Sequence, residues 1–328
     1  MGTMSRVSNP YALLMVTMVL WGGSFAGSKS VVEHLPHSVG AFLRFGGGAL
    51  ALLIAVAMFG SRTARVPARN GWLAAGAGVL GVFAYNGFFF WGLSLAPSLD
   101  AGILIPVLSP ILTSTFLLVT GKEKASWARV TGLALGLTGA GIFFIGAGGS
   151  GTGGSSRLLG DALFLLSAVC WASYTLAGPR VLSGIEPLRA TTYATCAGAV
   201  LLGFLAAPEA ADVAWSDLPA SVWLNTAYLA IGATAVANLL YYRGVGSVGP
   251  AKASLMMFNV PVINTLCATV LLGESLGGLQ GTGALVLVVG AVLAVTQGKL
   301  PWRSTDAKAQ PPVADQSTGR EGTRARSA

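Results

Sequence analysis

The chain is divided into ten apolar segments, each about long enough to cross a membrane. They cover residues 11–31, 38–60, 71–95, 98–120, 126–147, 158–180, 188–207, 217–241, 249–272 and 277–298. A helix that spans the hydrocarbon core of a bilayer needs roughly 20 mostly apolar residues. Only 10% of the residues are charged, whereas a soluble domain carries about 25%. The sequence therefore predicts an all-α polytopic membrane protein, for which lipid is the main solvent.

Positive charge predicts how the segments are oriented. Lys and Arg are concentrated in alternate short loops and in the tail at residues 299–328, with Arg6 before the first segment, whereas the loop at 208–217 is acidic. Because cytoplasmic loops carry the excess of Lys and Arg, we expect a multi-pass protein of the inner (plasma) membrane with both termini in the cytoplasm. The same distribution explains the net charge of +8 without a nucleic-acid partner.

The sequence also contains an internal repeat. The phrases "LSPILTSTFLLVTGKE" (108–123) and "NVPVINTLCATVLLGE" (259–274) hold a Pro and a Glu at the same spacing. An offset of 150 residues superposes Trp21 on Trp171, and an offset of 151 residues superposes Gly81 on Gly232, Pro110 on Pro261, Glu123 on Glu274, Gly132 on Gly283 and Gly139 on Gly290. Five segments make one unit and five is odd, so the second unit is expected to enter the membrane inverted.

The repeat and the composition together predict the domain organisation. We expect a cytoplasmic N-terminus at 1–10, a first repeat at 11–147, a Gly/Ser linker at 148–157 and a second repeat at 158–298. The polar segment at 299–328 reads as a disordered basic cytoplasmic tail, because it lacks the apolar residues that a packed core requires.

These features resemble the EamA family of the drug/metabolite transporter superfamily. The resemblance rests on the Trp near the start of each half ("VLWGGSFAG", "VCWASYTLAG"), the Arg of "AFLRF", and the repeated Pro…Gly-Glu phrase before a Gly-rich segment. The "GKEK" at 121–124 departs from the usual "GE" of that phrase. The resemblance implies ten transmembrane helices in two inverted five-helix repeats, with helices 1, 3, 4, 6, 8 and 9 around a central cavity and helices 5 and 10 at the periphery. Many bacterial members that this chain resembles export amino acids, metabolites or drugs.

Polar and aromatic side chains on the expected cavity helices are the candidate substrate-binding residues. Amides within a membrane helix seldom face lipid, because their donors and acceptors must be satisfied. Contact with a neighbouring helix explains any one of these residues as well as contact with substrate does. The candidates are Trp21, Ser24, Phe25, Tyr85, Asn86, Phe89, Pro106, Ser109, Thr113, Trp171, Tyr174, Asn238, Tyr241, Met256, Asn259 and Asn264.

The repeated phrase supplies candidate hinges and caps. Pro110 and Pro261 each remove a hydrogen bond from their helix, and irregular helices at matching places in two halves are typical of a transport site; helix packing alone is the alternative. Glu123 and Glu274 are expected to act as structural caps, because a carboxylate at a helix N-terminus meets free N–H groups.

Two further acids lie at the expected starts of segments. Asp100 begins segment four and Asp161 begins segment six, where capping explains both. No carboxylate is obviously placed for a proton relay. The sequence therefore leaves proton antiport, facilitated diffusion and exchange open.

Few other side chains suggest chemistry. Arg44 lies a couple of turns inside segment two, where we expect it to pair with a carboxylate or backbone carbonyls, direct substrate binding being the lesser alternative. The pair His34 and His37 lies in an outer loop and the three Cys lie in apolar runs, so no metal or other cofactor is expected. The pairs Gly132/Gly136 and Gly277/Gly281 have GxxxG spacing and are expected to set helix approach within the monomer.

The sequence therefore predicts a small-molecule transporter for an amino acid, metabolite or drug, working as an exporter by alternating access around a midplane cavity. Its partners are the substrate and the lipid bilayer, and it suits a monomer or a dimer. A nucleotide-sugar or phosphate-sugar carrier is the alternative, although we would expect Lys or Arg deep in its cavity. A membrane-embedded enzyme or a channel is less favoured, because neither a catalytic constellation nor a ring of charges is evident.

Overall fold

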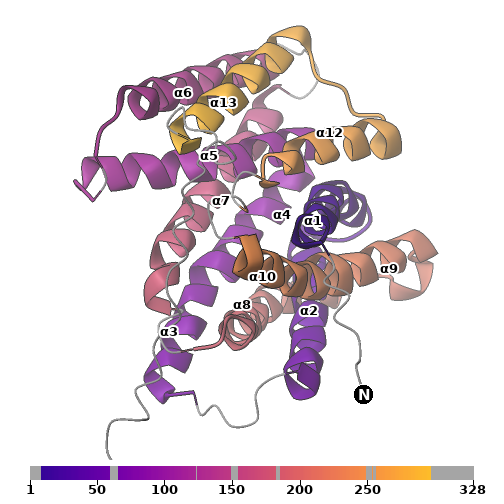
Figure 1. The fold of residues 1–328 in the computed structure, drawn as a ribbon. Helices are drawn as coiled ribbons and strands as arrows, with labels where there is room; N and C mark the ends of the chain where they lie inside the picture. The colour runs from indigo at the N-terminus through magenta and orange to yellow at the C-terminus, as the bar shows by residue number, and fades with distance from the viewer. Residues whose placement is uncertain are drawn as a thin grey trace, which may run out of the picture. The chain divides into compact units, whose positions relative to one another are not determined.

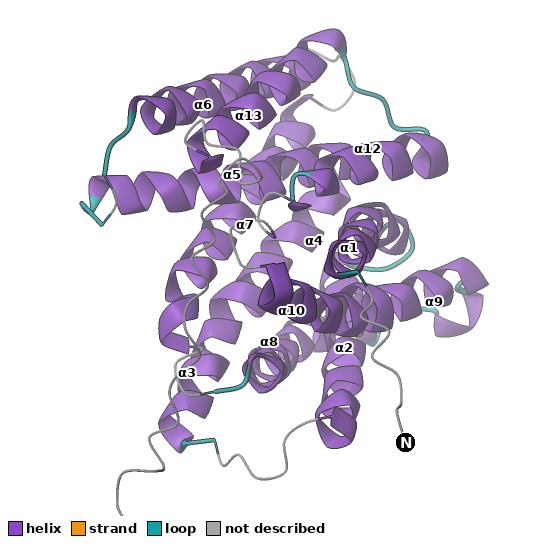
Figure 2. Ribbon diagram, viewed as in Figure 1, coloured by secondary structure: helices purple, strands orange, loops and turns teal. Residues whose placement is uncertain are grey.

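The computed structural model describes residues 9–59, 66–122, 124–148, 154–181, 185–248, 253 and 256–296. Over these ranges the secondary structure is helical, without a strand (Figure 2). Nine of the described helical segments are long and apolar enough to cross a membrane. The expectation of an all-α polytopic membrane protein is confirmed.

The first half contains five spans, whose described parts follow one another in the chain (Figure 1). Span one begins at Pro10, whose fixed φ suits a first helical position, and the Asn9 side chain accepts a hydrogen bond from the Tyr11 amide. The spans are α1 (Pro10–Val32), α2 (His37–Phe59), a third built from α3 (Ala68–Gly78), η1 (Val79–Ala84) and α4 (Tyr85–Leu95), then α5 (Ser98–Val119) and α6 (Trp127–Gly148).

The second half repeats this order. Its elements are α7 (Gly154–Val181), α8 (Pro187–Ala210), the short η2 (Trp215–Asp217), an eighth span built from α9 (Ala220–Ala227), η3 (Tyr228–Val236) and α10 (Ala237–Val248), then α12 (Asn259–Leu272) and α13 (Gly278–Thr296). The predicted segment 249–272 is described mainly through α12, which has 14 residues. Because α7 begins at Gly154, the end of the predicted linker is helical; residues 149–153 and 297–328 lie outside the described ranges.

A π-helix interrupts the third span and the eighth span. Gly81 lies in η1 and Gly232 lies in η3, so the two positions that the repeat superposes share the same unusual backbone. A π-helix replaces the usual i→i+4 hydrogen bonds by i→i+5 bonds, and such segments are frequent at functional sites. The two halves therefore carry matching irregular helices, as transporter repeats commonly do.

The two prolines that the repeat superposes lie at different distances from the starts of their helices. Pro110, together with Pro106, lies inside α5, which continues as one helix from Ser98 to Val119. Pro261 lies in the first turn of α12, where a backbone N–H has no intrahelical partner to lose. Pro261 therefore does not interrupt a described helix, so the two prolines do not occupy equivalent positions, and their role as hinges stays a prediction.

Three pairs of equivalent helices from the two halves lie side by side. α2 packs against α8, α5 against α12 and α6 against α13, and Figure 1 shows the last pair together. The other contacts also occur in matched sets: α1 packs on α10, η3 and α12, just as α7 packs on α4, η1 and α5. This exchange of partners is the pattern that two repeats related by an axis in the membrane plane would give.

Glycine allows α6 and α13 to approach closely. A Cβ atom added to Gly139 would collide with the backbone nitrogen of Leu287, and one added to Gly290 would collide with the backbone nitrogen of Gly136. Small residues at such crossings let helix backbones approach within a membrane. The predicted Gly277/Gly281 pair has no such role, because a Cβ at Gly281 meets nothing within 4 Å.

Glu274 connects the second half to the first. Its carboxylate accepts hydrogen bonds from the Ser98 amide (2.9 Å), the Ser98 hydroxyl (3.0 Å) and the Leu99 amide (2.8 Å). These two residues open α5, so Glu274 caps a helix of the other repeat and not α13, the helix that follows it in sequence. Its predicted counterpart Glu123 lies outside the described residues.

Candidate functional site

The structure brings the aromatic candidates into one region between the halves. Phe25 meets Phe89 edge-on at 5.5 Å between ring centroids, and Phe89 stacks on Tyr85 at 6.1 Å. Tyr85 in turn lies 5.3 Å from Trp171, which lies 5.6 Å from Tyr174. We call these five residues, together with the Trp21/Tyr241 pair described next, the aromatic cluster.

Trp21 extends the aromatic cluster toward α10. Its ring lies one helical turn before Phe25 on α1 and 5.0 Å from the Tyr241 ring. The Trp21 indole Nε1 donates a hydrogen bond to the carbonyl of Ala233 in η3 at 3.1 Å. Because α1 and α4 come from the first half and α7 and α10 from the second, both repeats supply rings.

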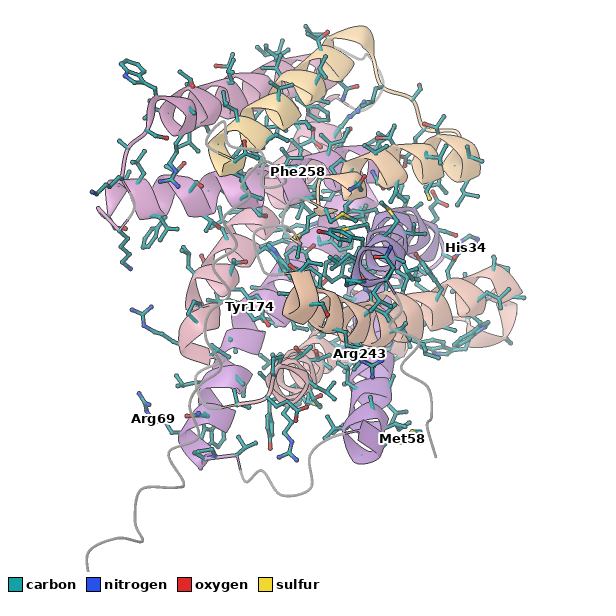
Figure 3. All side chains as sticks on the ribbon, viewed as in Figure 1. His34, Met58, Arg69, Tyr174, Arg243 and Phe258 are labelled. Atoms are coloured by element: carbon teal, nitrogen blue, oxygen red, sulfur yellow. The ribbon has the colours of Figure 1, made fainter. Side chains whose placement is uncertain are left out.

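The two π-helices flank the aromatic cluster. A Cβ atom added to Gly81 of η1 would lie 2.5 Å from the ring of Tyr174, which Figure 3 labels on α7. On the other side, the Tyr228 hydroxyl at the start of η3 donates to the carbonyl of Leu20 at 2.7 Å. The repeat match of Gly81 with Gly232 was the sequence signal for these segments, but it did not reveal a π-helix.

Most of the polar candidates bond to backbone carbonyls. The donor–acceptor distances are 2.7 Å for Ser24 to Trp21, 2.8 Å for Asn86 to Val82, 2.7 Å for Ser109 to Ile105, 2.9 Å for Thr113 to Ser109, 2.6 Å for Asn238 to Thr234 and 2.8 Å for Asn259 to Met256. In each bond the polar side chain donates to a carbonyl three or four residues earlier in the chain. For Asn259, the first residue of α12, that carbonyl lies before the helix. These bonds do not distinguish contact with a neighbouring helix from contact with substrate; Ser109 also donates to the Ala168 carbonyl of α7 at 3.4 Å, and the Asn86 carbonyl oxygen is buried without a partner.

Two candidates on or beside α12 bridge to other elements. The fully buried Asn264 donates from Nδ2 to the Ser98 carbonyl at 3.3 Å, and its side chain covers Gly102 of α5. Met256 packs against the main hydrophobic core, while its neighbour Met257 receives the Tyr241 hydroxyl at 3.8 Å. Asn264 thus holds α12 to the start of α5, beside the Glu274 cap.

Arg44 is buried at the edge of the aromatic cluster. Its guanidinium carbon lies 5.0 Å from the centroid of Phe45 and 6.0 Å from that of Phe89. Nη1 donates to the Ser28 hydroxyl at 3.2 Å, whereas Nε is buried with no hydrogen-bond partner. The carboxylate or carbonyl partner that the sequence led us to expect is not found among the described residues.

A second group of charges surrounds the start of α5. Arg157 makes a two-pronged ion pair with the fully buried Asp100, at 2.7 Å from Nε and 2.9 Å from Nη2. Lys29 donates to the carbonyls of Leu93 at 2.7 Å and Ala96 at 3.2 Å. These bonds join α7 to α5 and α1 to the end of α4.

Asp161 lies beside this group and is not a helix cap. It is fully buried inside α7, well past the first turn that begins at Gly154, and both its carboxylate oxygens lack a hydrogen-bond donor. The capping explanation is therefore wrong for Asp161. Asp100 does lie in the first turn of its helix.

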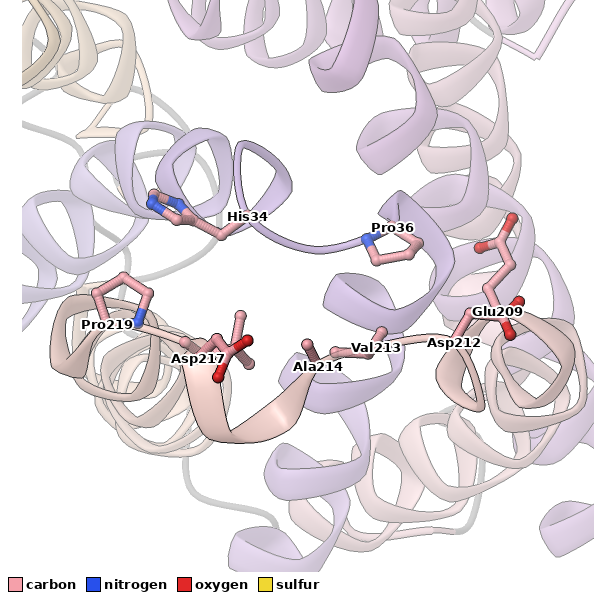
Figure 4. Close-up of a pocket in the computed structure, with 9 residues that line it drawn as sticks. His34, Pro36, Glu209, Asp212, Val213, Ala214, Asp217 and Pro219 are labelled. Carbon is pink, nitrogen blue, oxygen red and sulfur yellow. The ribbon is translucent and has the colours of Figure 1, made fainter.

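A hollow of about 380 Å³ opens between the turn after α1 and the segment that joins α8 to α9 (Figure 4). Its lining includes His34, Glu209, Asp212 and Asp217. The His34 Nδ1 atom already lies 3.1 Å from the Ser30 carbonyl. The part of the chain that the structure describes contains no group of three or more His, Cys, Asp or Glu side chains that could hold a metal ion.

Comparison with known proteins places the chain among transporters. It is 27% identical over 299 residues to the "Uncharacterized transporter YyaM" of Bacillus subtilis, covering 90% of this chain and 97% of that one. It is 28% identical over 294 residues to the "Uncharacterized inner membrane transporter YedA" of Escherichia coli, covering 88% and 91%. It is also 26% identical over 292 residues to a "Probable terminal-alkyne amino-acid exporter" of Streptantibioticus cattleyicolor, covering 88% and 94%.

The fold and the repeats agree with these relatives. A solved crystal structure that is 24% identical matches with a TM-score of 0.60, covering 87% of this chain and 98% of that one, which supports the fold alone. The model of the EamA-like transporter family matches twice, at residues 9–145 and 158–296. These ranges contain the two halves whose helices pair in the structure. The chain therefore belongs to the EamA-like transporter family, and it is a multi-pass membrane transporter.

Proposed function

We propose that this transporter exports small organic molecules, namely amino acids, metabolites or drugs, by alternating access, and that the aromatic cluster lines their path. The observation that carries the proposal is that both halves contribute rings to one cluster, through α1, α4, α7 and α10. A site shared between two inverted repeats opens to opposite sides as the repeats rock against each other. A relative named as an amino-acid exporter supports the substrate range and the direction.

The π-helices are the proposed moving parts. η1 supports Tyr174 and η3 holds Trp21, so a change in either segment displaces a ring of the cluster. Conversion between π and α hydrogen bonding shifts the helix register locally. Such a shift would move rings of the aromatic cluster apart and leave the contacts at the ends of the spans intact.

Counterflow in proteoliposomes tests the proposal. Vesicles loaded with an unlabelled compound are diluted into the same compound in labelled form, across a panel of amino acids and cationic drugs. We expect saturable exchange for at least one class, and a loss of about 10-fold with Trp171→Ala, the order expected from removing one or two aromatic contacts.

The matched control is Trp91→Ala. Trp91 lies on α4 near Tyr85 and Phe89, but its side chain is exposed and stacks on His37. Its removal is expected to leave exchange unchanged. Flux that rises linearly with concentration, or equal losses in both variants, would contradict the proposed transport path.

A further inference from the structure

We propose that Arg44 binds the carboxylate of the transported molecule, so that the substrates are carboxylate-bearing compounds with an apolar side group. This inference rests on the proposed function and names the substrate class for the same site. At the sequence level, a carboxylate or backbone carbonyls of the protein were the favoured partners of Arg44, and direct substrate binding was the lesser alternative. The inference favours substrate binding instead.

Arg44 is a buried charge that the described protein does not neutralise. Its side chain is 9% exposed, and the titratable groups that interact with it are Tyr85 and Tyr228, neither of which is a carboxylate. Moving an ion out of water is costly even after the protein relaxes around it. The two ring contacts and the one hydroxyl contact offset only part of that cost. An anionic partner would complete the site.

Two half-buried cations of this region have acceptors for their charge. Arg157 holds Asp100 in a two-pronged pair, and Lys29 donates to two backbone carbonyls. Arg44 differs from Arg157 and Lys29 because its Nε has no hydrogen-bond partner among the described residues. A lone unpaired donor in a membrane helix is costly to retain, which is why intramembrane ions commonly mark a substrate path.

The position of Arg44 suits a bound carboxylate. Its guanidinium lies 6.0 Å from the ring of Phe89, the central member of the aromatic cluster. Phe89 also contacts Phe25 and Tyr85. A guanidinium offers a planar fork that matches the two oxygens of a carboxylate. A substrate with its carboxylate on Arg44 would place its side group against these rings.

Paired probes test the inference with the wild-type protein. L-Phenylalanine, L-leucine and 3-phenylpropanoate are compared in counterflow with L-phenylalaninamide and L-leucinamide, which keep the side chain and the amino group but lack the carboxylate. We expect the acids to exchange with an affinity about 10- to 100-fold higher than that of the amides, the range expected for hydrogen bonds to a charged group.

Variants assign the effect to Arg44. Arg44→Gln is expected to weaken exchange of the acids by the same factor and to abolish the preference over the amides, while Arg44→Lys keeps part of it. The matched control is Arg129→Gln, which removes another buried guanidinium whose Nη1 donates to the Lys124 carbonyl at 2.9 Å. This control should leave the preference intact.

Thermal unfolding in detergent separates a binding role from a structural one. Without substrate, Arg44→Gln should be at least as stable as the wild type, because it removes an unpaired charge, and it should lose the stabilisation that L-phenylalanine or 3-phenylpropanoate confers. A less stable ligand-free variant would assign Arg44 to the fold and overturn the inference.

The outcomes distinguish the two proposals. Saturable exchange of the amides as good as that of the acids would overturn the role of Arg44 while upholding transport. Saturable exchange of cationic drugs with no exchange of the acids would also overturn the role of Arg44 and uphold transport. No saturable exchange of any compound would overturn the proposed function, and the inference with it.

Discussion

Replacing Glu274 by Ala should destabilise the protein by about 2–4 kcal/mol. The substitution removes the acceptor of three hydrogen bonds from Ser98 and Leu99 at the start of α5. Loss of a helix N-cap costs about 0.5–2 kcal/mol, and loss of a carboxylate from a partly buried helix N-terminus costs up to about 2 kcal/mol more. Ser98 and Leu99 are 0% and 1% exposed, so water does not replace the acceptor and the upper part of each range applies.

Equilibrium unfolding in mixed detergent micelles measures this difference. Glu274→Gln keeps a neutral acceptor but loses the charge, and its destabilisation should be about half that of the Ala variant. Glu33→Ala is the control, because Glu33 is an exposed carboxylate in the turn after α1. It should stay within about 0.5 kcal/mol of the wild type, as surface substitutions do.

The reasoning would be refuted by a Glu274→Ala variant as stable as the Glu33→Ala variant. That result would mean that the amides at the start of α5 find another acceptor without cost. A large loss with Glu274→Gln equal to that with Ala would show that charge alone matters, and that the hydrogen-bond geometry does not.

Two further predictions concern packing and buried charge. Gly139→Val should disrupt the α6–α13 contact and lower the unfolding free energy by several kcal/mol, as overpacking does. Gly141→Val is the control and should not lower it, because a Cβ atom at Gly141 meets nothing within 4 Å. Thermal unfolding of the two variants measures the difference. Asp161→Asn should leave the unfolding free energy unchanged or higher, since both oxygens lack a donor. Asp100→Asn should lower it by about 3 kcal/mol by breaking a buried ion pair, and equal losses in both would contradict the assignment.

Sequence reasoning identified the aromatic candidates from their helices. Trp21 and Phe25 are one turn apart, as are Tyr85 and Phe89, and this spacing places each pair on one helix face. It did not show that Phe89 is the ring through which Phe25 and Tyr85 are connected. Which faces meet depends on the crossing of helices far apart in the chain.

The two prolines of the hinge prediction occupy different places in their helices, and their role as hinges stays a prediction. Pro110 and Pro261 match in the repeat, yet the described helix α12 begins two residues before Pro261, whereas α5 begins well before Pro110. The effect of a proline depends on its distance from the helix start. The matching irregularities lie instead in η1 and η3, whose i→i+5 bonding has no distinct sequence signature.

The sequence by itself determined the solvent, the spans and the repeat, because hydropathy and spacing are properties of neighbouring residues. Tertiary structure alone decided which groups are paired. Glu274 looked like the cap of the next helix and instead caps α5 of the other repeat. Arg44 looked like half of an ion pair and instead lies buried beside Phe89, with no carboxylate among the described residues near enough to interact with it. Partners in a membrane bundle are set by which helices cross, and the energy of a buried charge depends on those partners.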